Sequence, residues 1–202
     1  MKTTKPVSTI SFNDPYYLME RLEELRKAKV LSWWCFIPHK PEDDEGGKKG
    51  HNHLYLEPAK SVQTEDLRAA LREFDPEHPD KPKGCLPMIK CNSFGDWYLY
   101  GKHDKAYLAT KNETRRYQYA DEEFISSDSD YFLYMVRSAH IDLTPINRLM
   151  ELVKQGASFT DAVARGFVPV PQVYAYQKVW EHLMAAAEHE DQTHRGGREG
   201  HE

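Results

Sequence analysis

Several kinds of segment and motif are missing from this sequence. It contains no run of about 18 apolar residues, so we expect no transmembrane helix and no membrane partner. The N-terminal stretch MKTTKPVSTISFNDP lacks the apolar core of a secretory signal. The three cysteines, Cys35, Cys85 and Cys91, form no CxxC pair, which argues against a zinc knuckle or a disulfide framework. Together these absences predict a protein of the reducing cytoplasm.

An excess of positive charge is also missing. The 27 Lys and Arg residues are outnumbered by 32 Asp and Glu residues, which gives a formal net charge of -5. This balance argues against broad, non-specific binding of nucleic acid. Bases nevertheless cluster in four short runs, at 48–49, 81–90, 102–105 and 111–116. A local basic groove therefore remains compatible with the sequence.

The order of elements predicts an α+β protein with an antiparallel sheet flanked by helices, followed by a small all-α domain. Apolar spacing and capping residues predict helices over 14–30 and 61–74. Short apolar runs predict strands at 31–39, 51–58 and 85–93. A helix over 94–111 and a short strand within 115–124 complete this part. We expect a first domain at 1–135, a helical domain at 136–190 and a disordered tail at 191–202.

The strand HNHLYLEP carries a candidate metal site. Side chains alternate between faces along a strand, so His51, His53, Tyr55 and Glu57 share one face. Two imidazoles in this arrangement can reach one ion, although an HxH motif taken alone is more often a pair of surface histidines. The preceding strand ends at His39, which is followed by the acidic run EDDE.

If the two strands pair, three imidazoles and one carboxylate can surround a divalent ion. Three nitrogens and one oxygen suit Mn²⁺ or Mg²⁺, with open positions left for a phosphate oxygen. The segment DWYLYGKHDK adds a candidate nucleophile, because Tyr100 and His103 share a face if this segment is one helix. Tyr98 points elsewhere on such a helix. A tyrosine is a weak nucleophile unless a metal-bound phosphate or a base lowers the barrier.

Three segments, FIPHKPED, GHNHLYLEP and WYLYGKHDKAYL, resemble in order and spacing the motifs of the HUH endonuclease superfamily. More narrowly, they are similar to the rolling-circle replication initiators of small plasmids from Gram-positive bacteria, the Rep_2-type family. The resemblance covers about residues 30–125. The set of three is fairly specific, whereas no single segment is. Asn52 departs from the family pattern, which more often has an apolar or aromatic residue between the two histidines.

The resemblance implies an HUH or RRM-like endonuclease domain that nicks and rejoins single-stranded origin DNA through a 5′-phosphotyrosine. It implies Tyr100 as the nucleophile, with His103 orienting the tyrosine or the phosphate. It places four ligands around the ion, most often Mn²⁺ with Mg²⁺ as the alternative: His39, Glu42, His51 and His53. Asp43 or Asp44 could replace Glu42 after a small shift in register. Basic residues near these motifs are expected to contact DNA phosphates: Lys48, Lys49, Lys102 and Lys105.

The resemblance also implies partners. These are the origin DNA, as a single-stranded hairpin beside double-stranded repeats, and the host replication helicase and polymerase. The helices at 136–190 resemble by position an oligomerisation domain, which implies a homo-oligomer that could be a hexameric ring. Two other interpretations remain open. One is a cupin-like metal protein using His51, His53 and Glu57, and the other is a DNA-binding regulator without catalytic activity.

Overall fold

The computed structural model of the chain describes residues 1–41, 49–73, 83–139, 144–168 and 172–196. It divides into two compact units. The first contains Met1–Lys102 and Ala120–His140, and the second contains His103–Tyr119 and Ile141–Glu202. The predicted α+β class is confirmed. Among the described residues, none of the helices combines the length and the apolar character needed to cross a membrane.

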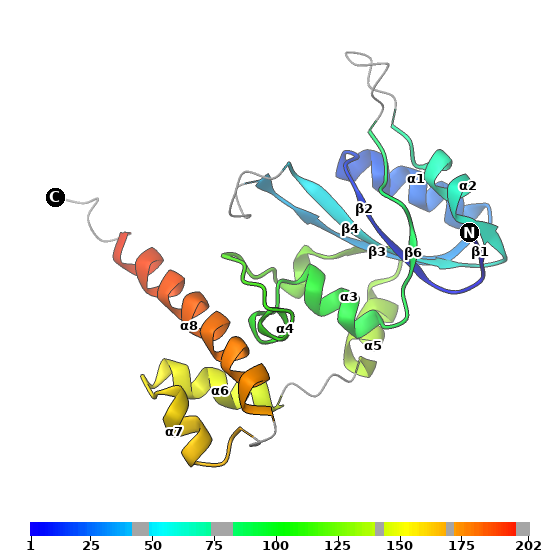
Figure 1. Cartoon of the computed structure of the whole chain (residues 1–202). Helices are drawn as coiled ribbons and strands as arrows, with labels where there is room; N and C mark the ends of the chain where they lie inside the picture. The colour runs from blue at the N-terminus through cyan, green and yellow to red at the C-terminus, as the bar shows by residue number, and fades with distance from the viewer. Residues whose placement is uncertain (42–48, 74–82, 140–143, 169–171, 197–202) are drawn as a thin grey trace. The chain divides into compact units, whose positions relative to one another are not determined.

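An antiparallel sheet with the strand order β6-β2-β4-β3-β7 forms the centre of the first unit. Its long pair is β3 (Leu31–His39) and β4 (His51–Pro58), which match the predicted strands and lie side by side in Figure 1. The shorter strands are β2 (Val7–Ser11), β6 (Ile89–Lys90) and β7 (Ile125–Ser126). A separate two-stranded sheet pairs β1 (Lys2–Thr3) with β5 (Val62–Gln63).

Helices cover both faces of the five-stranded sheet (Figure 1). On one face, α1 (Pro15–Lys27) and α2 (Thr64–Ala70) bury an apolar core that includes Phe36 and Leu54. On the other face lie α3 (Phe94–Gly101) and α5 (Ser129–Ser138), whose aromatic rings meet those of the sheet. This division follows from the alternation of side chains along each strand. The histidines of β3 and β4 share the face that α3 covers.

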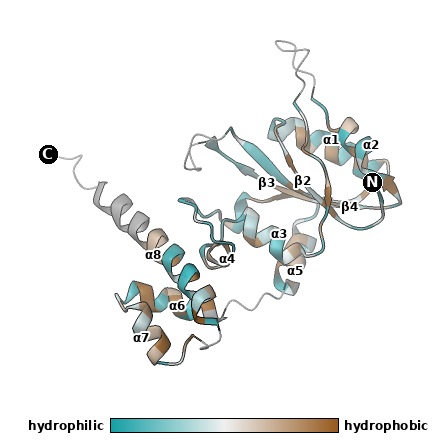
Figure 2. Ribbon diagram, in the orientation of Figure 1, coloured by the Kyte–Doolittle hydropathy of each residue, from teal (hydrophilic) through white to brown (hydrophobic). Residues whose placement is uncertain are grey.

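Helix α1 begins where the sequence predicted it. The carboxylate of Asp14 accepts hydrogen bonds from the backbone N–H groups of Tyr16 and Tyr17, at 2.9 and 3.2 Å, and Pro15 occupies the first turn. An N-cap acid and a proline at this position are typical of helix starts. Hydrophobic and hydrophilic residues alternate along α1 in Figure 2, and its buried side chains are Leu18 and Leu22.

The segment predicted as one helix over 94–111 forms two helices, so this prediction is wrong. Helix α3 ends at Gly101, and α4 (Lys105–Thr110) begins after an N-cap at Asp104. Between them, His103 has a φ of 57°, a left-handed conformation that a helix cannot accommodate. The expectation that Tyr100 and His103 share a helix face fails for the same reason.

The strands of the structure differ from the predicted strands at three places. The inner strand β2 was not predicted, because its sequence VSTIS is mostly polar and short. The strand predicted at 85–93 contains only two strand residues, those of β6. The strand expected within 115–124 lies just beyond that range, at β7. All three concern short segments whose strand character depends on their neighbours in the sheet.

The described part of the second unit is helical. Besides α4 it contains α6 (Thr144–Lys154), α7 (Phe159–Ala164) and α8 (Val173–Gly196). They share an apolar core that includes Ala106, Leu149 and Trp180. The segment 103–119 belongs to this unit, although the sequence placed it before a boundary near residue 135. Helix α8 continues to Gly196, into the segment for which we expected disorder. The helix extends this far because the sequence MAAAEHEDQTHR is rich in helix-forming residues.

Candidate functional site

Three histidines converge at one end of the β3–β4 pair. In the antiparallel register His39 lies opposite His51, and Ile37 lies opposite His53. Because directly paired side chains point to the same face, all three imidazoles lie on the side covered by α3. One ligand nitrogen from each histidine lies within 4.8 Å of the others. The described residues therefore contain a group of three imidazole ligands that could hold a metal ion.

The geometry of the group fits a divalent ion. The Nε2 atoms of His51 and His53 are 3.1 Å apart, and the ring centroids of His39 and His53 are 4.5 Å apart. Two neighbouring ligands of an octahedral ion, each bonded at about 2.1 Å, are separated by about 3.0 Å. His39 is 3 % exposed and His53 is 9 % exposed, whereas His51 is more open. Two of the three histidines are thus buried, and His51 is the one that is partly exposed.

Backbone carbonyls fix the orientation of two of these rings. Nε2 of His39 donates to the carbonyl of Gly101 at 2.7 Å, and Nδ1 of His51 donates to the carbonyl of Lys49 at 3.1 Å. A carbonyl only accepts hydrogen bonds, so these nitrogens carry the protons of the neutral rings. Nδ1 of His39 and Nε2 of His51 then carry the lone pairs. Metal-binding histidines are held in the same way by an outer hydrogen-bond partner.

Tyr100 lies against this cluster. Its ring centroid is 5.8 Å from that of His53, and the two rings meet edge to face. Tyr100 is half-buried near the end of α3, one residue before the carbonyl that holds His39. The structure therefore brings together four of the predicted site residues: His39, His51, His53 and Tyr100.

Tyr98 has a different environment. It is 6 % exposed and packs among the rings of Phe94, Phe124 and Phe132. Its hydroxyl donates to Asp121 at 2.5 Å and accepts from Lys102 at 3.0 Å. Burial, together with the hydrogen bond to Asp121, raises the pKa of Tyr98 to about 12. A phenol that holds its proton this firmly is a poor nucleophile, which favours Tyr100 of the two.

The predicted acidic ligand and one of the predicted lysines lie outside the described residues. These are Glu42, its alternatives Asp43 and Asp44, and Lys48. Lys49 is exposed, and its carbonyl holds His51. Lys102 forms an ion pair with Asp121 as well as its hydrogen bond to Tyr98. Its ammonium group therefore has partners within the first unit, and its contact with DNA stays a prediction.

His103 and Lys105 belong to the second unit. His103 is 4 % exposed, and its Nδ1 lies 3.1 Å from the carbonyl of Tyr117. Its ring also meets that of Tyr119, at 5.2 Å between centroids. Lys105 is the first residue of α4 and lines a pocket of about 180 Å³ together with residues of α6 and α8. The catalytic role of His103 and the DNA contact of Lys105 stay predictions.

Glu57 lies far along β4 from the histidines. It is four positions after His53, which corresponds to about 13 Å along a strand. Glu57 instead accepts a hydrogen bond from the hydroxyl of Tyr55 at 3.4 Å, and burial raises its pKa. The metal group found among the described residues contains only the three histidines. The structure thus gives no support for Glu57 as a ligand of the same ion.

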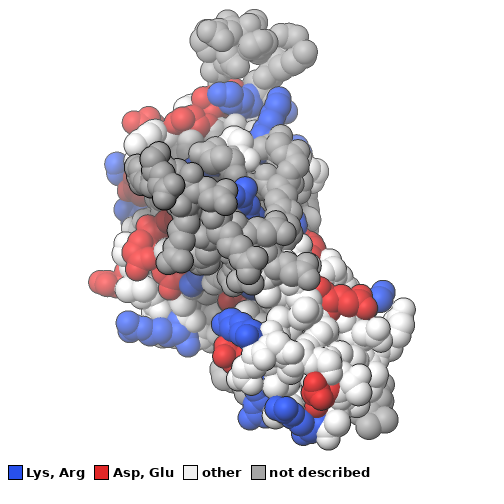
Figure 3. Space-filling model, turned by 90° about the vertical axis from the view of Figure 1, so that its left-hand side faces the viewer, with Lys and Arg blue, Asp and Glu red and all other residues white. Residues whose placement is uncertain are grey.

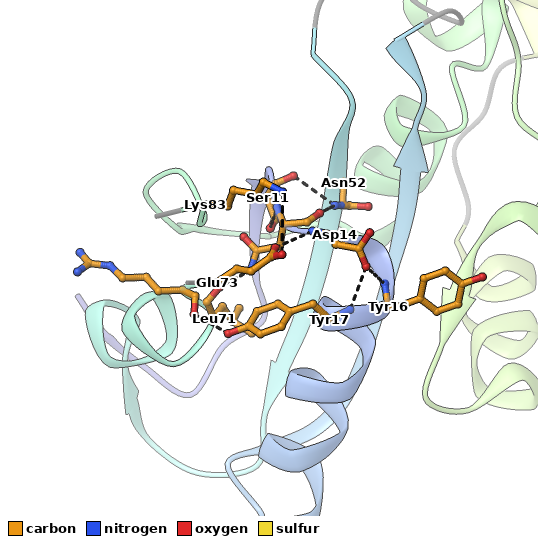
Figure 4. Close-up of polar contacts among 10 residues, drawn as sticks. Ser11, Asp14, Tyr16, Tyr17, Asn52, Leu71, Glu73 and Lys83 are labelled. Carbon is orange, nitrogen blue, oxygen red and sulfur yellow. Dashed lines mark hydrogen bonds and ion pairs between the residues drawn. The ribbon is translucent and has the colours of Figure 1, made fainter. Parts of the chain in front are cut away.

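Asn52, the residue between the two histidines of β4, has a structural role on the opposite face. It is 2 % exposed, and its Nδ2 donates to the carbonyls of Ser11 and Asn13, at 3.4 and 2.9 Å. Figure 4 shows Asn52 reaching from β4 toward Ser11, close to where α1 begins. An apolar residue at this position would leave these carbonyls without this donor, which is a structural reason for an asparagine between the two histidines.

Sequence reasoning missed the carbonyl that holds His39 and the acid that binds Tyr98 and Lys102. The carbonyl of Gly101 has no side-chain signature, and Asp121 is 19 residues from Lys102 in the sequence, with no spacing pattern to connect them. On the face shown in Figure 3, described basic and acidic side chains are interspersed. No protein-family model matches the chain, and no curated protein matches it.

Proposed function

We propose that this protein nicks and rejoins single-stranded DNA with Tyr100 as the nucleophile, as an initiator of rolling-circle replication of the HUH type. The observation that carries the proposal is the contact between the ring of Tyr100 and a cluster of three histidines that fits a metal ion. The resemblance of the three motifs supports the same function. A phosphodiester beside a tyrosine and a divalent ion is the arrangement that a covalent nicking reaction requires.

Each residue of the cluster has a defined part in this proposal. His39, His51 and His53 hold the ion, with one carboxylate from 42–44 as a further ligand. A bound Mn²⁺ or Mg²⁺ supplies positive charge next to the scissile phosphate. The hydroxyl oxygen of Tyr100 forms a bond to phosphorus, while the bond between phosphorus and the 3′ oxygen breaks. The phenol proton is released and the 3′ oxygen takes up a proton, which leaves a 5′-phosphotyrosine and a free 3′-OH.

The proposal also assigns the first unit to the HUH endonuclease type of domain. An antiparallel sheet that presents two paired strands with histidines, covered by a helix that carries the tyrosine, is what we expect of an HUH endonuclease domain. The helical second unit is proposed to mediate self-association, and the origin DNA, the helicase and the polymerase of the host are the proposed partners. The cupin-like alternative is less well supported, because the five-stranded sheet is covered by helices and Glu57 has other contacts.

A covalent-adduct assay tests the proposal. The protein is incubated with Mn²⁺ and labelled single-stranded oligonucleotides that tile the DNA flanking its own gene, with a random-sequence pool alongside. We expect a band that survives denaturation, is lost in Tyr100→Phe and after chelation, and persists in Tyr98→Phe, the matched control. An adduct that survives Tyr100→Phe would show that another residue is the nucleophile.

The metal site is tested separately with His51→Ala. We expect this variant to lose Mn²⁺ binding in calorimetry and to form no adduct, while its unfolding transition remains cooperative. If no oligonucleotide yields an adduct with the unchanged protein although Mn²⁺ binds, the regulator without catalytic activity becomes the better interpretation.

A further inference from the structure

A pocket of about 370 Å³ lies in the first unit, next to the end of β2. It is lined by residues from three segments: Phe12, Arg68, Arg72, Gly84, Cys85 and Leu86. Two of these residues are apolar and yet well exposed, Phe12 at 41 % and Leu86 at 45 %. The exposed ring of Phe12 can stack on a flat group, and a guanidinium beside it can bind an anion.

Hydrogen bonds hold the walls of this pocket in place. The backbone N–H of Phe12 donates to the carbonyl of Gly84 at 3.0 Å, which joins the end of β2 to the 84–86 segment. The guanidinium of Arg68 donates twice to the carbonyl of Cys85, at 3.3 and 3.1 Å, and also binds Glu65. Arg68 therefore supports the wall, and its charge is balanced by a neighbouring acid.

Arg72 differs from Arg68 in this respect. Its side chain is exposed, and its guanidinium makes no hydrogen bond or ion pair with another residue in the described part of the chain. The adjacent acid, Glu73, already accepts from the backbone N–H of Asp14 at 2.8 Å and lies 4.0 Å from the ammonium of Lys83 (Figure 4). Arg72 thus presents an exposed guanidinium to the pocket, and none of the acids among the described residues is paired with it.

Phe12 links the pocket to the histidine cluster, because it lines the pocket and its ring also approaches His51. The ring centroid of Phe12 lies 6.4 Å from that of His51, so one aromatic ring borders both places. A polymer that has one unit at the histidines and the next at the pocket must pass over this ring. Single-stranded nucleic acid has the required groups, because each nucleotide combines a flat base with a negatively charged phosphate.

We propose that this pocket binds the nucleotide next to the cleaved phosphate, with its base on Phe12 and a backbone phosphate at Arg72. The inference rests on the proposed function, since it takes single-stranded DNA as the ligand of the histidine cluster. Phe12 supplies a stacking surface that tolerates any base, and Arg72 supplies a phosphate contact that carries no sequence information. The pocket therefore contributes affinity and strand placement, while sequence preference arises elsewhere.

The test measures DNA binding in the absence of chemistry. All variants are made in Tyr100→Phe protein and studied in the presence of a chelator, with a fluorescein-labelled single-stranded oligonucleotide of mixed sequence. We expect Phe12→Ala to weaken binding at least about fivefold, the lower limit for loss of one stacked base. Phe12→Leu keeps the apolar bulk without the aromatic face, and it should weaken binding to a similar extent.

The arginine is tested by salt dependence. The logarithm of the binding constant falls linearly with the logarithm of the salt concentration, and each phosphate contact to a single strand adds about 0.7 to the steepness of this fall. We therefore expect Arg72→Gln to make the fall less steep by about 0.7. The matched controls are Arg137→Gln and Tyr134→Ala on α5, which remove one exposed charge and one exposed aromatic ring from the same unit. A photoreactive amino acid at position 12 should crosslink to the labelled strand.

The outcomes separate this inference from the proposed function. If Phe12→Leu and Arg72→Gln bind like their controls and position 12 gives no crosslink, the pocket is not a nucleotide site, even if Tyr100 forms adducts. If the pocket variants lose binding while the unchanged protein forms no adduct with any DNA, the pocket stands and the nicking reaction does not.

Discussion

Gly101 offers the sharpest test of how the fold supports the site. A Cβ added at this position would lie 3.0 Å from Cγ2 of Ile37, closer than side chains normally approach. Ile37 is fully buried in β3, so it has little room to move. In Gly101→Ala we therefore expect the end of α3 to shift away from the sheet by a few tenths of an ångström. That shift moves the carbonyl that holds His39 and the adjacent Tyr100.

Two opposing terms set the effect of Gly101→Ala on stability. Crowding of a packed interior costs about 1–3 kcal/mol, whereas replacing glycine by alanine in a helix contributes up to about 1 kcal/mol. The net loss should be at most about 3 kcal/mol. For a chain of this length, that corresponds to a fall in melting temperature of less than about 12 °C. The higher helix propensity does nothing to restore the hydrogen bond to His39.

Metal affinity should respond more strongly than stability. Loss of an outer hydrogen-bond partner of a metal-binding histidine typically costs 10- to 100-fold in affinity. We expect calorimetric titration with Mn²⁺ to show a loss of at least about tenfold in Gly101→Ala, with a parallel fall in adduct yield. Ile37→Ala removes the crowding methyl group, so in the double variant the two changes should be non-additive. Unchanged Mn²⁺ affinity in a destabilised Gly101→Ala protein would refute the link between α3 and His39.

Three further predictions concern residues around the site. The folded-state pKa of Tyr98 lies above its ordinary value of about 10, so its contribution to stability is present below pH 10 and is lost as pH rises toward 12. The stability difference between the unchanged protein and Tyr98→Phe, measured by urea unfolding, should shrink by about 2 kcal/mol over this range, and a flat difference would contradict the assignment. Asn52→Ala should lower stability by about 1–3 kcal/mol, because two buried carbonyls lose their donor, yet leave Mn²⁺ affinity unchanged. Glu57→Gln should also bind Mn²⁺ normally in calorimetry, and a loss of binding would revive the cupin-like interpretation.

The long strands and α1 could be predicted because each carries its own signal. β3 and β4 are apolar runs with clear ends, and Asp14 followed by Pro15 marks a helix start. β2 has no such signal. Its sequence VSTIS becomes a strand because both of its edges are hydrogen-bonded, to β4 and to β6. Strand formation of this kind depends on partners that are distant in the sequence.

The histidine cluster could be predicted from alternation along the strands, once β3 and β4 were taken to be paired. The break after α3 could not, because it depends on close packing of Gly101 against Ile37 and on a left-handed residue at His103. The distinction between Tyr98 and Tyr100 also required the structure. Only the three-dimensional arrangement reveals that Asp121 engages the Tyr98 hydroxyl, while the Tyr100 ring meets His53.

Each of the two units is built from two separate stretches of the chain, and this limits which fragments of the protein can fold. The chain passes from the first unit to the second after Lys102, returns after Tyr119 and leaves again after His140. A fragment that ends at residue 135 would retain α4 without α6 and α8, which bury Ala106 and Ala109. Such a fragment would expose an apolar surface to water and tend to aggregate. Biochemical dissection of this protein therefore has to replace residues rather than remove the C-terminal helices.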